Sequence, residues 1–144
     1  MLLKPGEREQ APGRLCARLQ DQGKMGSFDL VAEDGRGSLA GWLSVEVLPF
    51  RRAAQTGYLV IGVDAAEAGH GIGRDLLVAA AQEACGRGLG RLELTVMADN
   101  LRALGLYLRS GFQVEGLRRH ALVRDGLVID EYYMGKLLPQ NENG

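Results

Sequence analysis

The sequence predicts an α+β fold built on a mixed, mostly antiparallel sheet. Three observations support this prediction. Alternating apolar and polar residues predict strands both before and after the middle of the chain, and two segments show helical periodicity. One strand–helix–strand unit lies between two predicted hairpins. Because too few strands are followed by helices, a doubly wound parallel sheet is excluded.

Length and composition are those of one ordinary globular domain. The chain has 144 residues, of which 46% are hydrophobic and 24% charged, and its net charge is −1. This balance gives no electrostatic reason for a nucleic-acid or membrane-surface partner, and no apolar run reaches the roughly 20 residues of a membrane helix. Cys16 and Cys85 lack the spacing of metal ligands. We therefore expect a single cytoplasmic domain over residues 1–144 that holds no metal.

The first 27 residues are expected to contain one short helix. Pro12 suits the first turn of a helix, Leu15 and Leu19 lie four residues apart, and Gly23 is a stop signal. The predicted helix therefore runs from Pro12 to about Gln22.

An antiparallel hairpin is predicted after this helix. Its strands are Phe28–Glu33 and Leu39–Leu48, joined by a turn at residues 34–37. The second strand alternates, with one face formed by Leu43, Val45 and Val47 and the other by Trp42, Ser44 and Glu46.

The middle of the chain predicts a right-handed parallel unit. The nearly continuous apolar run Tyr58–Val63 indicates a central strand buried on both faces. A helix is predicted over Gly71–Arg87, and a second strand over Leu92–Met97. The apolar stripe of that helix consists of Ile72, Leu76, Leu77, Ala80 and Ala84.

The remaining elements are a second helix and a long hairpin. The helix is predicted over Asn100–Ser110. Phe112 begins a hairpin that turns at Asp125–Gly126 and returns through Val128–Leu137. Residues 139–144 form a polar tail.

Glycines mark the start of the first long helix. Gly69, Gly71 and Gly73 lie where unpaired backbone N–H groups and a partial positive charge are expected. Such a loop can hold a pyrophosphate, or it can simply turn the chain into the helix. The Rossmann spacing and the Walker lysine are both absent, so the loop does not match the usual nucleotide-binding motifs.

Two motifs resemble the GNAT superfamily of N-acetyltransferases. The loop Ala68-Gly69-His70-Gly71-Ile72-Gly73 is similar to its motif A, although Ala68 stands where Arg or Gln is usual. Asn100, Ala103 and Tyr107, followed by Gly111-Phe112, are similar to its motif B. Three runs further along the chain make it most similar to bacterial L-amino acid N-acyltransferases. They are Val114-Glu115-Gly116, Arg124-Asp125-Gly126 and Asp130-Glu131-Tyr132-Tyr133-Met134.

The resemblance implies a GNAT-like sheet with helices on both faces. The family begins with a strand and two helices before the hairpin, and the shortened segment of residues 1–27 leaves room for one helix. We therefore expect the first strand and first helix to be missing. Because a sheet edge would then be unpaired, we also expect a homodimer that covers it.

The resemblance also implies an activity, the transfer of an acetyl group from acetyl-CoA to a small-molecule or peptide amine. Tyr107 would be the catalytic residue, donating a proton to the leaving thiolate. The residues implied in binding acetyl-CoA are Ile61, Val63, Gly69, His70, Gly71, Ile72, Gly73, Arg74, Asn100, Ala103 and Tyr107.

Several alternatives remain open at this stage. Tyr107 could be a core aromatic residue, and Asn100 could cap its helix in addition to binding the ligand. The general base is not identified; Glu46, Asp130 and Glu131 are the candidates. The alternatives for the whole protein are an acetyl-CoA-binding protein without transfer activity and a nucleotide-binding module.

Overall fold

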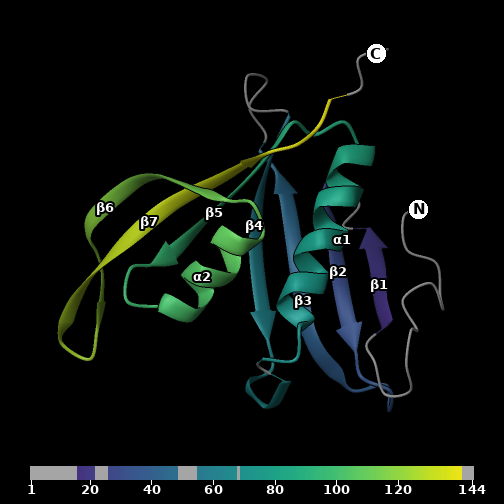
Figure 1. Ribbon diagram of the computed structural model, residues 1–144, viewed down its shortest axis with the longest axis horizontal. Coiled ribbons are helices and arrows are strands. Elements are labelled where there is room, and N and C mark those ends of the chain that lie inside the picture. The colour runs from purple at the N-terminus through teal and green to yellow at the C-terminus, as the bar shows by residue number, and fades with distance from the viewer. Residues whose placement is uncertain (1–15, 22–25, 49–54, 68, 141–144) are drawn as a thin grey trace.

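The computed structural model describes residues 16–21, 26–48, 55–67 and 69–140, and every structural statement below refers to these. They form a seven-stranded sheet of order β1-β2-β3-β4-β5-β7-β6, with two helices packed on it (Figure 1). The elements are β1 (Cys16–Asp21), β2 (Phe28–Glu33), β3 (Leu39–Val47), β4 (Thr56–Val63), the 3-10 helix η2 (Ala65–Glu67), α1 (Ile72–Gly86), β5 (Arg91–Met97), α2 (Leu101–Arg109), β6 (Gln113–Arg124) and β7 (Leu127–Leu137).

The predicted mixed, mostly antiparallel sheet is confirmed. Of the neighbouring strand pairs, β4 and β5 alone are parallel, and α1 connects them as the predicted crossover helix. The predicted strand Phe28–Glu33 matches β2, and the helix expected over Gly71–Arg87 matches α1 to within one residue at each end. Strong periodicity therefore placed these elements correctly.

The helix predicted over Pro12–Gln22 is wrong where the structure describes it. Residues Cys16–Asp21 form β1, which pairs antiparallel with β2 from Cys16↔Glu33 to Asp21↔Phe28. The free backbone groups along the edge of β2 favour a paired strand over the weak helical spacing of this segment. The expectation that the first strand is missing is therefore also wrong, and the edge for which a homodimer was expected is already paired. The homodimer itself stays a prediction.

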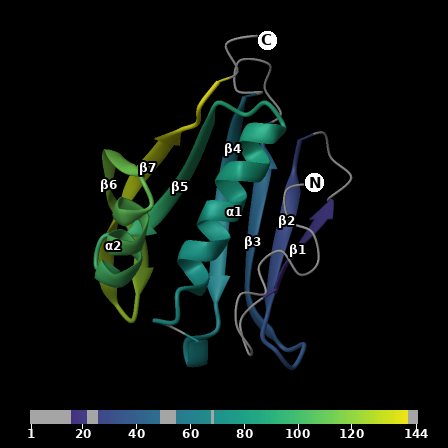
Figure 2. The ribbon, with the colours of Figure 1, turned by 45° about the vertical axis from the view of Figure 1, so that its right-hand side comes forward.

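The two described α-helices, α1 and α2, cover the same face of the sheet (Figure 2). The prediction that helices cover both faces is therefore wrong for the described part of the chain. Helix α1 lies against β3 at Gly41, where an added Cβ atom would stand 3.1 Å from Ile72. The opposite face carries exposed side chains, among them Trp42 at 40% and Val60 at 45%. The strand predicted over Tyr58–Val63 is therefore buried on one face rather than on both. The prediction of two buried faces was wrong because a run of apolar residues does not show how many layers cover a strand.

The core lies between the two helices and the covered face. The predicted stripe of α1 is buried throughout, and burying each large side chain contributes about 1.5–3 kcal/mol. The largest fully buried apolar residues are Phe28, Leu30, Leu43, Val45, Ile72, Leu76, Leu92 and Met134. The same packing sets α2 beside the N-terminal half of α1, because Gly73 of α1 lets Leu106 of α2 approach closely.

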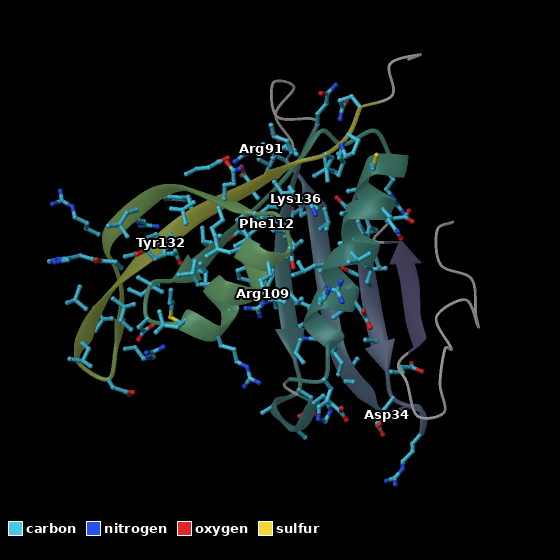
Figure 3. All side chains as sticks on the ribbon, viewed as in Figure 1. Asp34, Arg91, Arg109, Phe112, Tyr132 and Lys136 are labelled. Atoms are coloured by element: carbon cyan, nitrogen blue, oxygen red, sulfur yellow. The ribbon has the colours of Figure 1, made fainter. Side chains whose placement is uncertain are left out.

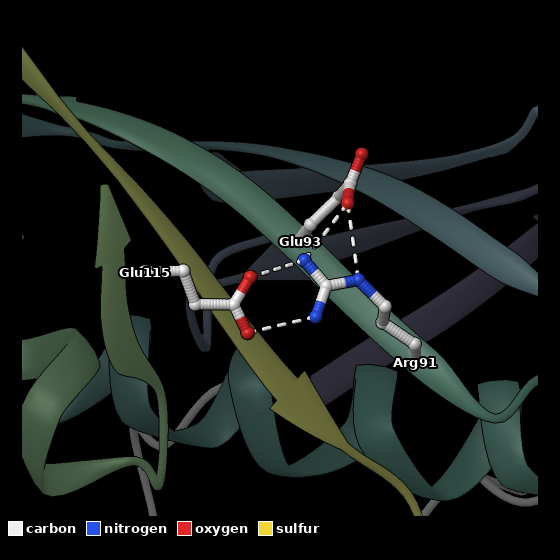
Figure 4. A network of polar contacts seen from close by, with 3 residues as sticks. All are labelled: Arg91, Glu93 and Glu115. Atoms are coloured by element: carbon white, nitrogen blue, oxygen red, sulfur yellow. Dashed lines mark hydrogen bonds and ion pairs between the residues drawn. The ribbon is translucent and has the colours of Figure 1, made fainter. Parts of the chain in front are cut away.

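On the uncovered face, a network of three charged residues joins β5 to β6 (Figure 4). Arg91 bonds Glu93 on its own strand and Glu115 on β6, at nitrogen–oxygen distances of 2.6 to 3.1 Å. The intervening strand β7 has Gly135 at the crossing point, where an added Cβ atom would lie 2.5 Å from Arg91.

Candidate functional site

The site begins where β4 and β5 separate. These parallel strands pair only from Thr56↔Arg91 to Tyr58↔Glu93. Along the rest of β4, the backbone groups of even-numbered residues bond to β3, as the bond from Asp64 N–H to Ala40 O shows. Because backbone groups alternate along a strand, those of Leu59, Ile61 and Val63 point into the gap. Ile61 and Val63, both predicted as binding residues, therefore lie on an unpaired strand edge.

A cavity with a volume of about 530 Å³ occupies the space between β4, the start of α1 and α2. All the predicted binding residues except His70 line it. The His70 side chain is 66% exposed, and its Nδ1 lies 3.2 Å from Glu67 Oε2. Tertiary structure thus brings together two motifs that lie about thirty residues apart in the sequence.

The glycine loop has a left-handed backbone at two of its three glycines. Gly69 and Gly71 have φ angles of +87° and +83°, a left-handed conformation that side chains disfavour. Gly71 is the N-cap of α1 and offers no side-chain acceptor, so its side chain cannot cap the first N–H groups of the helix. Gly73 has a different role, because an added Cβ atom would stand 2.8 Å from Leu106 Cδ2.

Sequence reasoning missed several cavity residues contributed by α2. Arg102, Leu106 and Arg109 all line the cavity, and Arg109 lies between α2 and α1 in the view of Figure 3. An added Cβ atom at Gly69 would lie 3.1 Å from Arg102 Nη2, so this guanidinium sits beside the glycine loop. The four- and three-residue spacing of the three side chains on one helix face was the signal that could have identified them.

Ser110 is a further residue that the motifs did not indicate. Its hydroxyl oxygen is buried and has no hydrogen-bond partner among the described residues, although Ser110 lines the cavity. An unsatisfied buried hydroxyl is costly and indicates a missing partner. Ser110 therefore lines the cavity with a hydroxyl that is buried beneath the wall.

Asn100 caps α2, which is one of the two roles that the sequence suggested for this residue. Its Oδ1 accepts a hydrogen bond of 3.2 Å from Ala103 N–H. Asn100 and Ala103 also line the cavity. The cap uses the oxygen of the side chain, and the amide nitrogen is available to a ligand.

Tyr107 combines a core position with a place in the cavity wall. The residue is 8% exposed, and its ring meets that of Phe112 edge-on with centroids 6.1 Å apart. Burial raises the pKa of the Tyr107 phenol above its ordinary value of 10.0, and the electrostatic effect of the Tyr58 phenol raises it further. The phenol is therefore a proton donor at neutral pH.

The candidate general bases lie outside the cavity. Asp130 Oδ1 accepts a hydrogen bond of 2.9 Å from His120 N–H and so holds the irregular part of β6. Glu46 stands across from Tyr58, and Glu131 across from Met97, both on the uncovered face. Trp42 packs over Gly62.

Among the described residues, no group of three or more His, Cys, Asp or Glu residues is placed to hold a metal ion. Within the same ranges, none of the helices has the length and apolar character needed to cross a membrane.

Comparison with known proteins identifies the class to which this fold and cavity belong. The Acetyltransferase (GNAT) family matches residues 3–112, which is most of the chain. The chain therefore belongs to the GNAT acetyltransferase family.

The individual proteins to which the chain is similar have different named activities. The chain is 42% identical over 86 residues to mycothiol acetyltransferase from Clavibacter michiganensis subsp. michiganensis, covering 58% of this chain and 26% of that protein. It is 31% identical to the L-amino acid N-acetyltransferase AaaT from Escherichia coli over 70% of this chain and 63% of that protein. The chain thus spans less than two thirds of both relatives.

A solved structure shows the same fold. The protein yncA from Salmonella typhimurium, solved with its cofactor acetyl-CoA, superposes with a TM-score of 0.75 at 25% identity. The match covers 82% of this chain and 68% of that one.

Proposed function

We propose that this protein is an N-acetyltransferase that moves an acetyl group from acetyl-CoA to a primary amine by direct attack. The observation that carries the proposal is one cavity that joins the unpaired edge of β4, the glycine loop of α1 and the Tyr107 phenol. These three features supply a surface for an extended chain, a site for phosphates and a proton donor.

The described residues fit the parts of acetyl-CoA. The N–H groups at Gly71 and the guanidinium groups of Arg74 and Arg102 suit the phosphates. The backbone groups of Ile61 and Val63 suit the pantetheine arm, which would pair with β4 as an added strand. The relative yncA, which shares the fold, was solved with acetyl-CoA.

Acetyl-CoA supplies an acyl group activated as a thioester. The N–H of Val63 would polarise the carbonyl of that group, as donors do in an oxyanion hole. Tyr107, protonated because its pKa is raised, would donate a proton to the leaving thiolate, whose ordinary pKa is about 8.5 by analogy with cysteine. The chemistry requires no covalent enzyme intermediate.

The acceptor is proposed to be an amino acid or a peptide amine. The relative AaaT is named as an L-amino acid N-acetyltransferase and supports this choice. We also propose that the protein works in the cytoplasm and as a homodimer; because β1 already pairs with β2, a sheet edge open to a second copy would be β1 itself.

An acetyl-CoA-binding protein without transfer activity is the second candidate. It is favoured by the sheet face opposite the cavity, which no described helix covers and where Trp42 is 40% exposed. No described helix closes that face over a bound amine.

Isothermal titration with acetyl-CoA, ATP and NAD, followed by a thiol-release assay with a panel of amines, separates the candidates. We expect binding of acetyl-CoA alone and turnover with amino acids or short peptides. Binding of ATP or NAD without acetyl-CoA would overturn the proposal in favour of a nucleotide-binding module. Acetyl-CoA binding without turnover on any amine supports the second candidate.

A further inference from the structure

A second cavity, of about 270 Å³, lies where β3 begins and β4 ends. Val63 lines both this cavity and the larger one. The proposed function places the carbonyl of the thioester at the Val63 N–H. The second cavity therefore adjoins the group that an amine would attack.

The indole ring of Trp42 forms one wall of the second cavity. Trp42 and Gly62 stand opposite each other in the pairing of β3 with β4. An added Cβ atom at Gly62 would stand 2.7 Å from the indole Nε1 and 2.8 Å from Cε2, so the ring rests directly on the backbone of β4. Trp42 is nevertheless 40% exposed, and part of its ring is open to a ligand.

Asp64 places a carboxylate at the same cavity. Its backbone N–H donates to Ala40 O at 2.8 Å, and its Oδ1 accepts a hydrogen bond of 3.0 Å from Ala66 N–H. These two bonds hold the residue in place, while Oδ2 has no partner among the described residues. Of the described residues that line the cavity, Asp64 alone carries a charge, so the cavity attracts cations.

An exposed aromatic ring beside a carboxylate suits an organic ammonium group. The ring attracts a cation through its quadrupole, and the carboxylate accepts hydrogen bonds from the ammonium N–H groups. An apolar ligand would contact Trp42 but would gain nothing from Asp64, and an anion would be repelled by it. The chemistry of the cavity therefore favours a positively charged amine.

We propose that this cavity binds a positively charged group of the acceptor, so that the acceptor is an amino acid or peptide with a basic side chain. The inference rests on the proposed function and narrows its acceptor. The amine that receives the acetyl group lies near Val63, and a second, protonated amine lies between Trp42 and Asp64.

Trp42 is the one tryptophan of the chain, so its fluorescence reports on this cavity directly. A titration compares L-lysine amide with L-norleucine amide, which has the same carbon chain without the terminal ammonium group. We expect the wild type to bind the lysine amide at least about tenfold more tightly. Asp64→Asn, which keeps an oxygen for the Ala66 N–H, should remove most of this preference. Asp34→Asn is the matched control, because Asp34 also accepts backbone N–H bonds in a turn but lies outside both cavities.

Turnover shows whether the cavity serves the acceptor. With acetyl-CoA as donor, kcat/KM should be at least about tenfold higher for the lysine amide than for the norleucine amide. Trp42→Leu should lower this ratio, and Trp42→Phe, which retains an aromatic ring, should lower it less.

The outcomes separate this inference from the proposed function. Equal affinity of the wild type for the two amides overturns the inference, as does an unchanged preference in Asp64→Asn. If that variant does not fold, Asp64→Ser, whose hydroxyl can also accept the bond from Ala66, decides in the same way. A binding preference that no kcat/KM preference accompanies overturns the acceptor role of the cavity. Absence of acetyl-CoA binding overturns the proposed function, and it is measured separately because the fluorescence titration needs no acetyl-CoA.

Discussion

Arg91 and Glu115 join two strands that are not neighbours in the sheet. The Arg91 guanidinium on β5 donates two hydrogen bonds, of 2.8 and 2.6 Å, to the Glu115 carboxylate on β6. Strand β7 lies between them, and Gly135 gives the ion pair space to cross it. A paired guanidinium and carboxylate in this fork geometry form a directional contact.

Gly135→Ala should destabilise the fold by about 1–3 kcal/mol, because the new methyl group enters the space of the ion pair. Glu115→Gln should cost about 1 kcal/mol or less, since the pair is half exposed. Denaturant unfolding of both variants measures the difference. In the Glu115→Gln background, Gly135→Ala should cost less than in the wild type; equal costs would show that the ion pair is not what the methyl group displaces.

The same pair predicts a loss of stability in acid. The hydrogen bonds from Arg91, and then its charge, lower the pKa of Glu115 below the ordinary 4.5. A lowered folded-state pKa adds stability above the unfolded value, and this stability is lost as the pH falls through the folded value. The difference in unfolding free energy between wild type and Glu115→Gln should therefore be constant at neutral pH and shrink below about pH 4. A difference that does not change down to pH 2 would contradict this.

Tyr107→Phe should lower kcat by about a hundredfold or more and leave acetyl-CoA affinity nearly unchanged, because it removes only the proton donor. Steady-state kinetics with the best acceptor and titration with acetyl-CoA measure the two effects. Tyr132→Phe is the matched control, since Tyr132 is a partly buried tyrosine packed against the same core outside the cavity. Because the pKa of Tyr107 is raised, its deprotonation should not limit kcat below about pH 10. An unaltered kcat in Tyr107→Phe would remove this residue from the chemistry.

Arg102→Gln should weaken acetyl-CoA binding about ten- to a hundredfold, the usual range for a hydrogen bond to a charged group. Arg102 lies beside Gly69, next to the position where Ala68 lacks the family's Arg or Gln. The loss should be absent for acetylpantetheine, which has no phosphates, and smaller at high salt. Arg119→Gln, on the exposed hairpin, is the control. A loss of the same size for acetylpantetheine would rule out a phosphate contact.

Gly73→Ala should weaken acetyl-CoA binding while changing stability little. The substitution favours the helix by about 1 kcal/mol, but its methyl group displaces Leu106, 2.8 Å away, toward the cavity. Gly86→Ala, in the same helix with nothing within 4 Å, should gain stability and bind normally. Adding Leu106→Ala to Gly73→Ala should restore the affinity; failure to do so would place the defect elsewhere.

Local sequence pattern was sufficient for most elements and for the family. Alternation and helical periodicity are short-range signals, so the strands from Phe28 onward and both helices were predicted nearly to the residue. The spacing of Asn100, Tyr107 and Phe112 identified the motif B helix, and the same residues lie at the cavity and its adjoining core.

Contacts between distant segments determined the rest. Cys16–Asp21 is a strand because the edge of β2 pairs with it, whatever its own weak helical spacing. Val60 is exposed because both described helices lie on the other face. Arg102 meets Gly69, and Tyr58 meets Thr95 37 residues away, only after the chain has folded. Hydrogen bonds and packing between remote residues leave no periodic signal, so these features could not be predicted from the sequence.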